Sequence, residues 1–263
     1  SLEIHSIVSK PIKENIIKAK YCHHLPNKND DIDRLILEIN PEIFINFAWK
    51  GIPDYTLDNS LYSVNNTIKL TQACLKSGTK KIISTGSCWE YLNPKGNVHE
   101  EWELDNSNFF KASKNFCNNT LNILCKEYDA NLIWLRLFYV FGDYQHKNSL
   151  LPFLINEARL GREPIAKNPY ASLDFINASD VSSVILKLID LNDFSGNLNV
   201  GSGRSYLVGD IVNEVRSVFG YKKIIFNVDA ENQVNFYSDQ TKFDSLIEFN
   251  PSNIYDYIQK YNK

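Results

Sequence analysis

The sequence lacks the features that mark nucleic-acid-binding and membrane-spanning proteins. Its 28 basic and 31 acidic residues leave a net charge of −3, and the basic residues are scattered along the chain. A nucleic-acid-binding surface needs clustered positive charge, so this class is excluded. The longest apolar runs, 43–49 and 132–142, are far shorter than the roughly 18 residues of a membrane span, and the second contains Arg136. We expect neither nucleic acid nor a membrane as partner.

Cysteine is scarce and methionine is missing. The five cysteines are an odd number without a paired metal-ligand spacing, which favours free thiols in a cytoplasmic protein. Cys22, His23 and His24 are adjacent, but neighbouring side chains on a strand point to opposite faces, so we expect no metal site. A chain of 263 residues ordinarily contains about five methionines. Their absence, with Ser1 as the first residue, predicts that the native chain begins earlier.

The first half of the sequence alternates short apolar runs with helical patterns. Such alternation is typical of βαβ units around a parallel sheet. The expected strands are 2–8, 43–48, 81–85 and 132–140; the expected helices are 31–39, 57–77 and 109–128, and 11–19 is a helix or turn. The predicted fold class is therefore α/β, with a Rossmann-like doubly wound parallel sheet.

The pattern changes after residue 142. We expect helices at 150–160, 181–191 and 210–219 and extended segments at 172–176, 198–200 and 223–228. These elements predict a smaller C-terminal α/β lobe. The first domain is expected to span 1–142, with about 171–200 returning to it, and the lobe to comprise 143–170 and 201–263.

Three segments carry residues suited to binding or chemistry. STGSCWEY at 84–91 follows an expected strand at the edge where open α/β sheets bind ligands, although helix capping is the alternative role for its hydroxyls. Ala48 ends the preceding strand and is small enough for backbone to approach a flat ligand; core packing is the alternative. Phe110 and Lys114 are four residues apart and share one helix face.

Six segments in this order resemble the extended short-chain dehydrogenase/reductase family, the NAD-dependent epimerases and dehydratases of nucleotide sugars. They are INFAW (45–49), ISTGSCWEY (83–91), FKASK (110–114), LRLFYVFG (135–142), LDFINASDV (173–181) and NVGSGR (199–204). The resemblance implies a cytoplasmic NAD(P)-dependent oxidoreductase or epimerase of nucleoside-diphosphate sugars. Within the family, it favours 4-keto-6-deoxy sugar reduction in surface-polysaccharide biosynthesis.

The resemblance also implies a serine, tyrosine and lysine that act together. Ser87 matches the serine and Lys114 the lysine, but Phe110 stands where the family has its tyrosine. A phenyl ring has no ionisable oxygen, and loss of a positioned acid or base commonly costs about 10²- to 10⁴-fold in rate. Either the chain is a Tyr→Phe variant that holds substrate without turnover, or it is naturally impaired or uses another donor, for which Tyr91 and Tyr139 are candidates. A catalytically silent binding protein is therefore the alternative function.

Further site residues follow from the same resemblance. Ser9 and Lys10, after the first expected strand, offer a hydroxyl and a cation for the 2′-phosphate of NADP, which mildly favours NADP over NAD; a plain surface lysine is the alternative. The full cofactor set is Ser9, Lys10, Ala48, Trp49, Lys114 and Phe138. The expected substrate set is Lys50, Ser87, Cys88, Trp89, Tyr139, Arg162 and Arg204, and it makes the C-terminal lobe the substrate lobe.

One family feature is missing from the sequence. Family members begin with a strand, a G-x-x-G-x-x-G turn and a helix, whereas 2–8 leads into SKPIKEN, and Gly201-x-Gly203 lies far downstream. We therefore expect an N-terminal extension of roughly 20 to 30 residues in the native protein. Without the central strand, two half-sheets should remain. The resemblance further implies a homodimer through the helices at 57–77 and 109–128.

Overall fold

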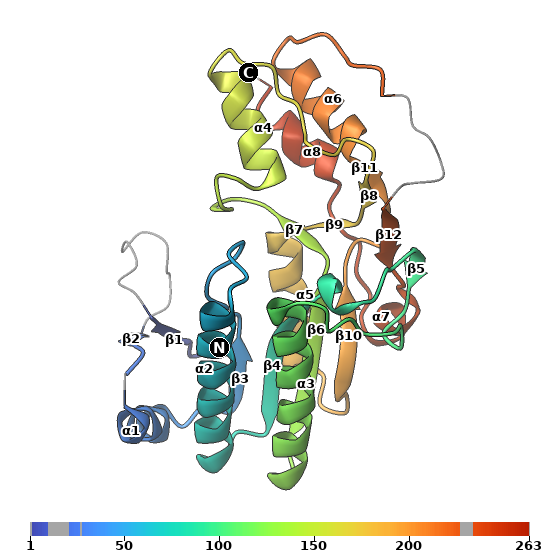
Figure 1. Cartoon of the computed structure of the whole chain (residues 1–263). Coiled ribbons are helices and arrows are strands. Elements are labelled where there is room, and N and C mark those ends of the chain that lie inside the picture. The colour runs from blue at the N-terminus through green and yellow to red at the C-terminus, as the bar shows by residue number, and fades with distance from the viewer. Residues whose placement is uncertain (1, 10–20, 27, 227–233, 263) are drawn as a thin grey trace. The chain divides into compact units, whose positions relative to one another are not determined.

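The computed structural model describes residues 2–9, 21–26, 28–226 and 234–262 (Figure 1). The chain divides into two compact units. Unit 1 comprises 1–84 and 108–133, and unit 2 comprises 85–107 and 134–263. The helix or turn expected at 11–19 lies outside the described residues. Within the described ranges, no helix is long and apolar enough to cross a membrane.

Unit 1 contains two parallel strand pairs. Strand β1 (His5–Val8) pairs with β2 (Tyr21–His24), and β3 (Ile43–Asn46) pairs with β4 (Lys81–Ser87) with Ile43 opposite Lys81. The first pair forms a sheet of its own. The second belongs to a four-stranded sheet of order β10-β6-β4-β3, with β6 at Asn131–Leu137 and β10 at Gly196–Val200. The pair β1-β2 and the four-stranded sheet are separate from each other, and the expected N-terminal extension stays a prediction.

Three helices accompany these strands in unit 1. Helix α1 (Asn29–Ile39) packs on α2 (Leu57–Lys76), and α2 runs alongside α3 (Phe109–Glu127) (Figure 1). Gly78, with φ of +106°, follows α2 in the left-handed conformation that favours glycine, which is typical of the residue that ends a helix. The side chain of Asn108 accepts a hydrogen bond from the Lys111 N–H at 3.0 Å and begins α3. This cap fixes the helix turn that carries Phe110.

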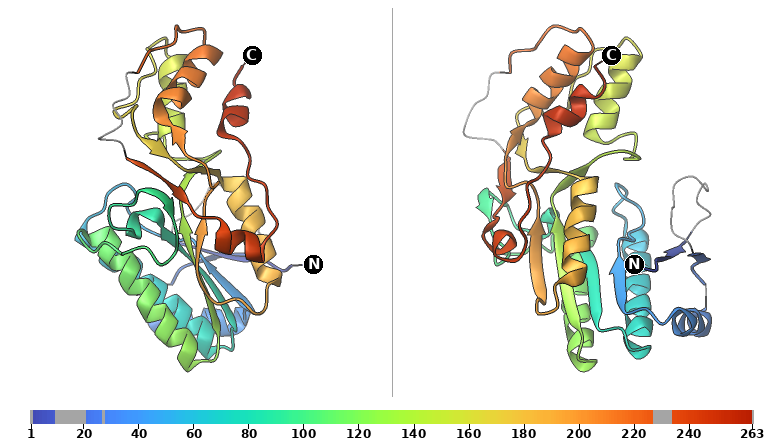
Figure 2. Two further views of the ribbon diagram at one scale, coloured as in Figure 1. Left: turned by 90° about the vertical axis from the view of Figure 1, so that its right-hand side faces the viewer. Right: turned by 180° about the vertical axis from the view of Figure 1, so that it is seen from behind.

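Unit 2 contains the remaining strands and helices. Strand β7 (Tyr139–Phe141) pairs in parallel with β9 (Phe175–Asn177), and a second sheet has the order β11-β8-β12-β5. Its strands are β11 (Tyr206–Leu207), β8 (Ser172–Leu173), β12 (Asn235–Ser238) and β5 (Gly96–Val98). Helices α4 (Leu150–Arg159), α6 (Val208–Val218) and α8 (Ile254–Gln259) pack together around an apolar core (Figure 2). Helices α5 (Ala178–Asp190) and α7 (Thr241–Leu246) and the 3₁₀ helix η1 (Cys88–Glu90) complete the unit.

The expected α/β class with Rossmann-like parallel sheets is confirmed, and so are the expected helices in the described residues. The strand boundaries needed correction. The single strand expected at 132–140 is two strands, because Phe138 N–H bonds to Val200 O and Tyr139 N–H to Asp174 O. The segment expected to be extended at 223–228 is not a strand over 223–226, and its last two residues lie outside the described residues. Four short strands, β2, β5, β11 and β12, were not among the expected segments. Their pairing depends on residues elsewhere in the sequence, which local propensity does not reveal.

Candidate active site

A lysine and two aromatic rings form a cluster in unit 1. Lys114 is 4% exposed, and its Nζ lies 3.9 Å from the centroid of the Trp49 ring and 5.9 Å from that of Phe110. The Trp49 and Phe110 rings meet edge to face, with centroids 5.7 Å apart. A cation over an indole face is attracted by the ring quadrupole, which holds the ammonium in place. Three of the predicted site residues are therefore brought together.

Tyr55 also belongs to this cluster, although no periodicity or motif in the sequence points to it. Its half-buried ring lies 4.7 Å, centroid to centroid, from Phe110. Tyr55 lies in the loop between β3 and α2, where the Asn59 side-chain amide donates to the Asp54 carboxylate at 3.1 Å. Phe110 therefore packs against two aromatic rings, Trp49 and Tyr55, which both lie in the segment between β3 and α2.

The other residues predicted after β3 lie apart from this cluster or at its edge. Ala48 is exposed, and its N–H donates to the Asn46 side-chain oxygen at 3.0 Å, which shapes the turn. Lys50 is exposed, and its Nζ lies 4.5 Å from the centroid of the Tyr62 ring on α2. At the end of β1, Ser9 is exposed, while Lys10 lies outside the described residues.

The turn after β4 presents Ser87 in unit 2. Its hydroxyl oxygen accepts from the Trp89 N–H at 3.2 Å, so the capping role left open by the sequence is filled. Accepting this bond leaves the hydroxyl its own hydrogen for donation. The Trp89 indole N–H donates to the Tyr139 hydroxyl at 3.2 Å, so two predicted substrate residues are in contact. Ser87 and Lys114 belong to different units, and their convergence stays a prediction.

Two residues assigned to ligands are instead core residues. Cys88 is 2% exposed and Phe138 is 3% exposed, and both belong to an apolar cluster with Tyr91, Val98 and Phe236. Burial also raises the pKa of the Cys88 thiol far above its ordinary value. Their side chains therefore offer almost no surface to a cofactor or substrate, which corrects the expectation for these two positions.

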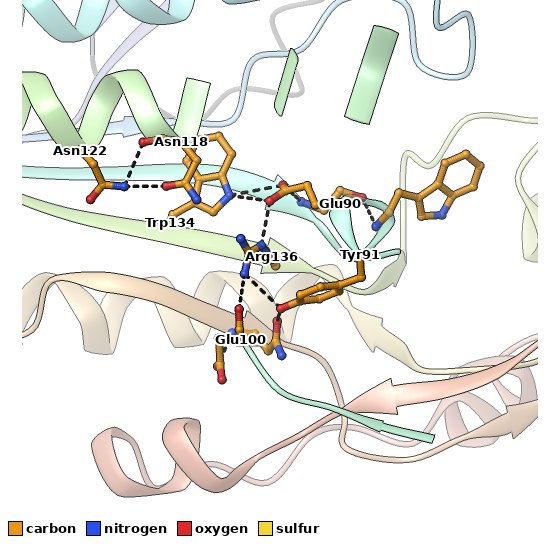
Figure 3. Close-up of polar contacts among 10 residues, drawn as sticks. Glu90, Tyr91, Glu100, Asn118, Asn122, Trp134 and Arg136 are labelled. Atoms are coloured by element: carbon orange, nitrogen blue, oxygen red, sulfur yellow. Dashed lines mark hydrogen bonds and ion pairs between the residues drawn. The ribbon is translucent and has the colours of Figure 1, made fainter. Parts of the chain in front are cut away.

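A buried ion pair adjoins the Ser87 turn and was missed by the sequence analysis (Figure 3). Glu90 and Arg136 are 0% and 1% exposed, and the Arg136 Nε donates to Glu90 Oε2 at 2.8 Å. Arg136 Nη1 also donates to the Tyr91 hydroxyl at 3.2 Å. The arginine inside an otherwise apolar strand was the available signal, because a charge at such a position needs a buried partner.

Tyr91 is corrected as a candidate proton donor. Its hydroxyl donates to Asn199 Oδ1 at 2.6 Å, and the residue is 1% exposed. Burial raises the pKa of Tyr91 well above its ordinary value despite the neighbouring Arg136. A phenol that holds its proton so firmly inside the core is a structural group.

The Gly201-x-Gly203 turn holds an anion that belongs to the protein itself. The buried Asp174 carboxylate accepts from the Ser202 N–H at 2.7 Å and the Gly203 N–H at 3.1 Å. The Ser238 hydroxyl donates to the same carboxylate at 2.6 Å. These amides are therefore engaged by an internal carboxylate rather than presented to a phosphate. Arg204 next to the turn is exposed.

A cavity of about 600 Å³ lies in unit 2, within the size range of small-molecule sites. Its lining includes Gly142, Asn148, Lys147, Arg159 and Tyr257. Arg162, predicted to bind a diphosphate, is exposed and forms an ion pair with Glu157. The cavity therefore has cations of its own that the sequence analysis did not single out.

The comparison with known families matches residues 3–201 to the NAD dependent epimerase/dehydratase family. The chain belongs to this family. Among solved structures, a UDP-N-acetylglucosamine 4-epimerase from Methanobrevibacter ruminantium in complex with UDP-N-acetylmuramic acid has a TM-score of 0.81 at 19% identity, covering 99% of this chain and 88% of that one. A UDP-glucose 4-epimerase from Thermotoga maritima with UDP-glucose has a TM-score of 0.81 at 16% identity, covering 97% and 88%. These likenesses establish the epimerase/dehydratase fold.

A curated relative is also similar in sequence. A dTDP-6-deoxy-L-talose 4-dehydrogenase (NAD(+)) from Aggregatibacter actinomycetemcomitans is 24% identical over 177 residues. The match spans 66% of this chain and 65% of the relative, slightly less than two thirds of its length.

Membership of an NAD dependent family raises the question of which residues fit a dinucleotide. The Lys114 ammonium beside the Trp49 ring supplies a cationic donor and an aromatic surface, which suit the ribose and nicotinamide end. The sequence contains no G-x-x-G-x-x-G turn for the pyrophosphate, and the 201–203 turn is engaged by Asp174. The residues thus fit the reactive end of the dinucleotide.

Proposed function

We propose that this chain binds a nicotinamide dinucleotide and a nucleoside-diphosphate sugar and acts on the sugar at its 4-position, with reduction of a 4-keto-6-deoxy sugar as the preferred reaction. The observation that carries the proposal is that the ammonium of the buried Lys114, on α3, lies over the ring of Trp49, which follows β3. The chain that holds this pair belongs to the epimerase/dehydratase family. The talose 4-dehydrogenase relative supports the choice of a 6-deoxy sugar. Such a reaction suits the assembly of surface polysaccharides.

The dinucleotide, when bound, would supply or accept the hydride. Lys114 would donate to the nicotinamide ribose hydroxyls, and Trp49 would limit access of water to that end. Ser87, with its hydrogen available, would donate to the sugar oxygen at the reacting carbon. Trp89 and Tyr139, joined by a hydrogen bond, would form an aromatic surface for the sugar ring.

The diphosphate of the substrate requires cations in the C-terminal lobe. Arg204 and Arg162 were expected to provide them, and Lys147 and Arg159 line the cavity in unit 2. Arginine suits this task because its planar guanidinium forms two hydrogen bonds with a phosphate. Ser9 and Lys10 would favour NADP over NAD if they face the adenosine ribose.

Phe110 specifically favours the alternative function, a binding protein without turnover. Its ring is 5% exposed and packs against the Trp49 and Tyr55 rings, so a phenyl group fits its place. It has no proton to exchange with the sugar oxygen, and a positioned acid or base is commonly worth about 10²- to 10⁴-fold in rate.

Restoration of the phenol is the first prediction and the test between these two functions. NADH and NADPH are titrated first, followed by dTDP-6-deoxy-L-talose, UDP-glucose and UDP-N-acetylglucosamine, with binding measured by calorimetry. Turnover is then compared before and after Phe110→Tyr in the direction of sugar oxidation, in which added NAD⁺ or NADP⁺ accepts a hydride from C4 of dTDP-6-deoxy-L-talose and gives NADH or NADPH, the 4-keto sugar and a proton. We expect the variant to raise kcat by about 10²-fold or more. Phe109→Tyr, at the exposed neighbouring position, is the control and should leave kcat unchanged.

The outcomes separate the two functions. Binding of a dinucleotide and a sugar nucleotide without turnover in either form would establish the silent binding protein. Failure of the chain to bind any of these ligands would contradict the proposed function as a whole.

A further inference from the structure

The carboxylate of Glu90 is bonded to the main chain of Ser87. Glu90 Oε1 accepts from the Ser87 N–H at 2.7 Å, and the Trp134 indole N–H donates to Glu90 Oε2 at 3.1 Å (Figure 3). Together with Arg136 Nε, three donors therefore converge on one carboxylate that has no contact with solvent. Such a fully bonded buried group holds its neighbours in a defined geometry.

Arg136 is fixed in turn by a network that continues away from Ser87. Its Nη1 donates to the main-chain oxygen of Glu100 at 2.9 Å, and its guanidinium carbon lies 4.9 Å from the centroid of the Tyr91 ring. The Asn199 N–H donates to the Glu100 carboxylate at 2.8 Å. The Ser87 turn is thus joined by consecutive buried hydrogen bonds to Glu100, which follows β5, and to Asn199 in β10.

The backbone at residue 86 is shaped to admit this carboxylate. A Cβ on Gly86 would collide with the Trp134 indole nitrogen and with Glu90 Oε1. A buried ion pair is a poor source of stability, because removal of both charges from water offsets most of their attraction. A glycine that makes room for a costly buried charge indicates a role in placing the adjoining turn.

We propose that Glu90, held by Arg136, is a positioning residue that sets the direction in which the Ser87 hydroxyl donates its hydrogen. The Glu90–Ser87 bond fixes the Ser87 main chain, and the Trp89 N–H fixes the hydroxyl oxygen as acceptor. The hydroxyl hydrogen then points to one side of the turn. This inference rests on the proposed function, since it assigns Ser87 to the sugar oxygen.

The test uses a matched pair of double variants in a parent that turns over, either this chain or its Phe110→Tyr variant. Glu90→Gln/Arg136→Met removes both charges and keeps an oxygen acceptor for the Ser87 N–H. Glu90→Leu/Arg136→Met removes both charges and that acceptor. Because neither variant leaves a lone buried charge, both are expected to fold, which thermal unfolding checks.

We expect the Gln variant to keep a kcat close to that of the parent. The Leu variant should lose kcat by about 10²-fold, the effect of a misplaced group, with an unchanged Kd for NADH. In a Ser87→Ala background the Leu variant should cost nothing further, because Glu90 acts only through Ser87. Asp180→Asn is the control: its buried carboxylate bonds Ser252 in the same unit, so its loss should lower stability and leave kcat unchanged.

Three results would overturn the positioning role. The first is a Leu variant with parental kcat, and the second is an equal loss in both double variants. The third is a Glu90→Leu/Arg136→Met pair that lowers kcat by the same factor in the Ser87→Ala background as in the parent. If the parents bind dTDP-6-deoxy-L-talose without turnover, the same cycle is measured as Kd for that nucleotide. Failure of the proposed function shows differently: no parent binds or converts any sugar nucleotide, and the role of Glu90 falls with it.

Discussion

Phe110 keeps the aromatic ring that its position needs and omits the phenol oxygen. The ring packs against Trp49 and Tyr55, while Lys114 lies on the next turn of the same helix. Binding and proton transfer are therefore separable at this position, because the packing does not depend on the missing atom. Single atoms also affect stability at Gly86 and at the buried thiols.

Gly86→Ala should destabilise the protein by about 1–3 kcal/mol, the usual cost of an extra methyl group in a packed interior. The added Cβ would collide with the Trp134 indole nitrogen and the Glu90 carboxylate. Urea unfolding measures the change in free energy. Trp134→Phe removes one of the colliding atoms and should recover part of the loss in the double variant. An unchanged unfolding midpoint for Gly86→Ala would contradict the described packing.

Stability should fall as the pH rises above about 9, and the buried thiols of Cys74 and Cys125 should contribute to the fall. Burial raises the pKa of Cys74 to about 12 and that of Cys125 to about 11, from an ordinary 9.0. Below pH 9 both thiols are protonated in the folded and unfolded states, so their full contribution to the free energy of unfolding is present. Above it the unfolded state loses these protons first, and unfolding becomes easier.

Urea midpoints at pH 8 and pH 10 measure this effect. Other groups titrate in the same interval, so the comparison is made with variants. Cys74→Ala/Cys125→Ala should show a smaller drop than the unchanged protein. Cys22→Ala, at the exposed thiol, should show the same drop. Equal drops in all three proteins would exclude the thiols of Cys74 and Cys125 as a cause.

At the scale of secondary structure, the helices α1 to α6 followed from the sequence, whereas α7, α8 and the strand partners did not. The apolar spacing and the Asn108 cap define α3 locally, so its start was predictable to within a residue. The break at Phe138 depends on hydrogen bonds to Val200 and Asp174, which lie far away in the sequence. The same holds for the candidate site. Sequence motifs pointed to Ser87 and Lys114, whereas Tyr55 and Glu90 became evident only through their contacts in the folded chain.

Asn108→Ala should lower the free energy of unfolding by about 1 kcal/mol, the typical effect of replacing a helix N-cap residue by alanine. The Asn108 side chain accepts from the Lys111 N–H at the start of the helix that carries Phe110 and Lys114. Circular dichroism during urea unfolding should show the loss in Asn108→Ala. Asn108→Asp keeps the acceptor and should remain near the original stability. A similar loss in both variants would mean that the cap bond is not responsible.

At the scale of the whole molecule, the helices of unit 1 expose large apolar side chains. Leu61 on α2 is 55% exposed and Phe116 on α3 is 54% exposed. Exposed apolar groups on neighbouring helices are typical of a surface that another protein covers. The homodimer implied by the family resemblance would use these two helices.

Leu61→Glu/Phe116→Glu should therefore convert a dimer into a monomer, because two charges per subunit would be buried in the interface. Light scattering after size-exclusion chromatography measures the mass. Ile225→Glu alters an isolated side chain in unit 2 that is 90% exposed, and it should leave the mass unchanged. A monomeric unmodified protein, or a dimer that survives the double substitution, would contradict this interface.

The boundary between the two units has a practical consequence for work on the protein. The chain passes from one unit to the other after residues 84, 107 and 133, and two of these passages lie inside β4 and β6. A fragment made by shortening the gene from either end would therefore carry incomplete pieces of at least one unit. Isolating unit 1 would require the excision of 85–107 and a new peptide linker in its place.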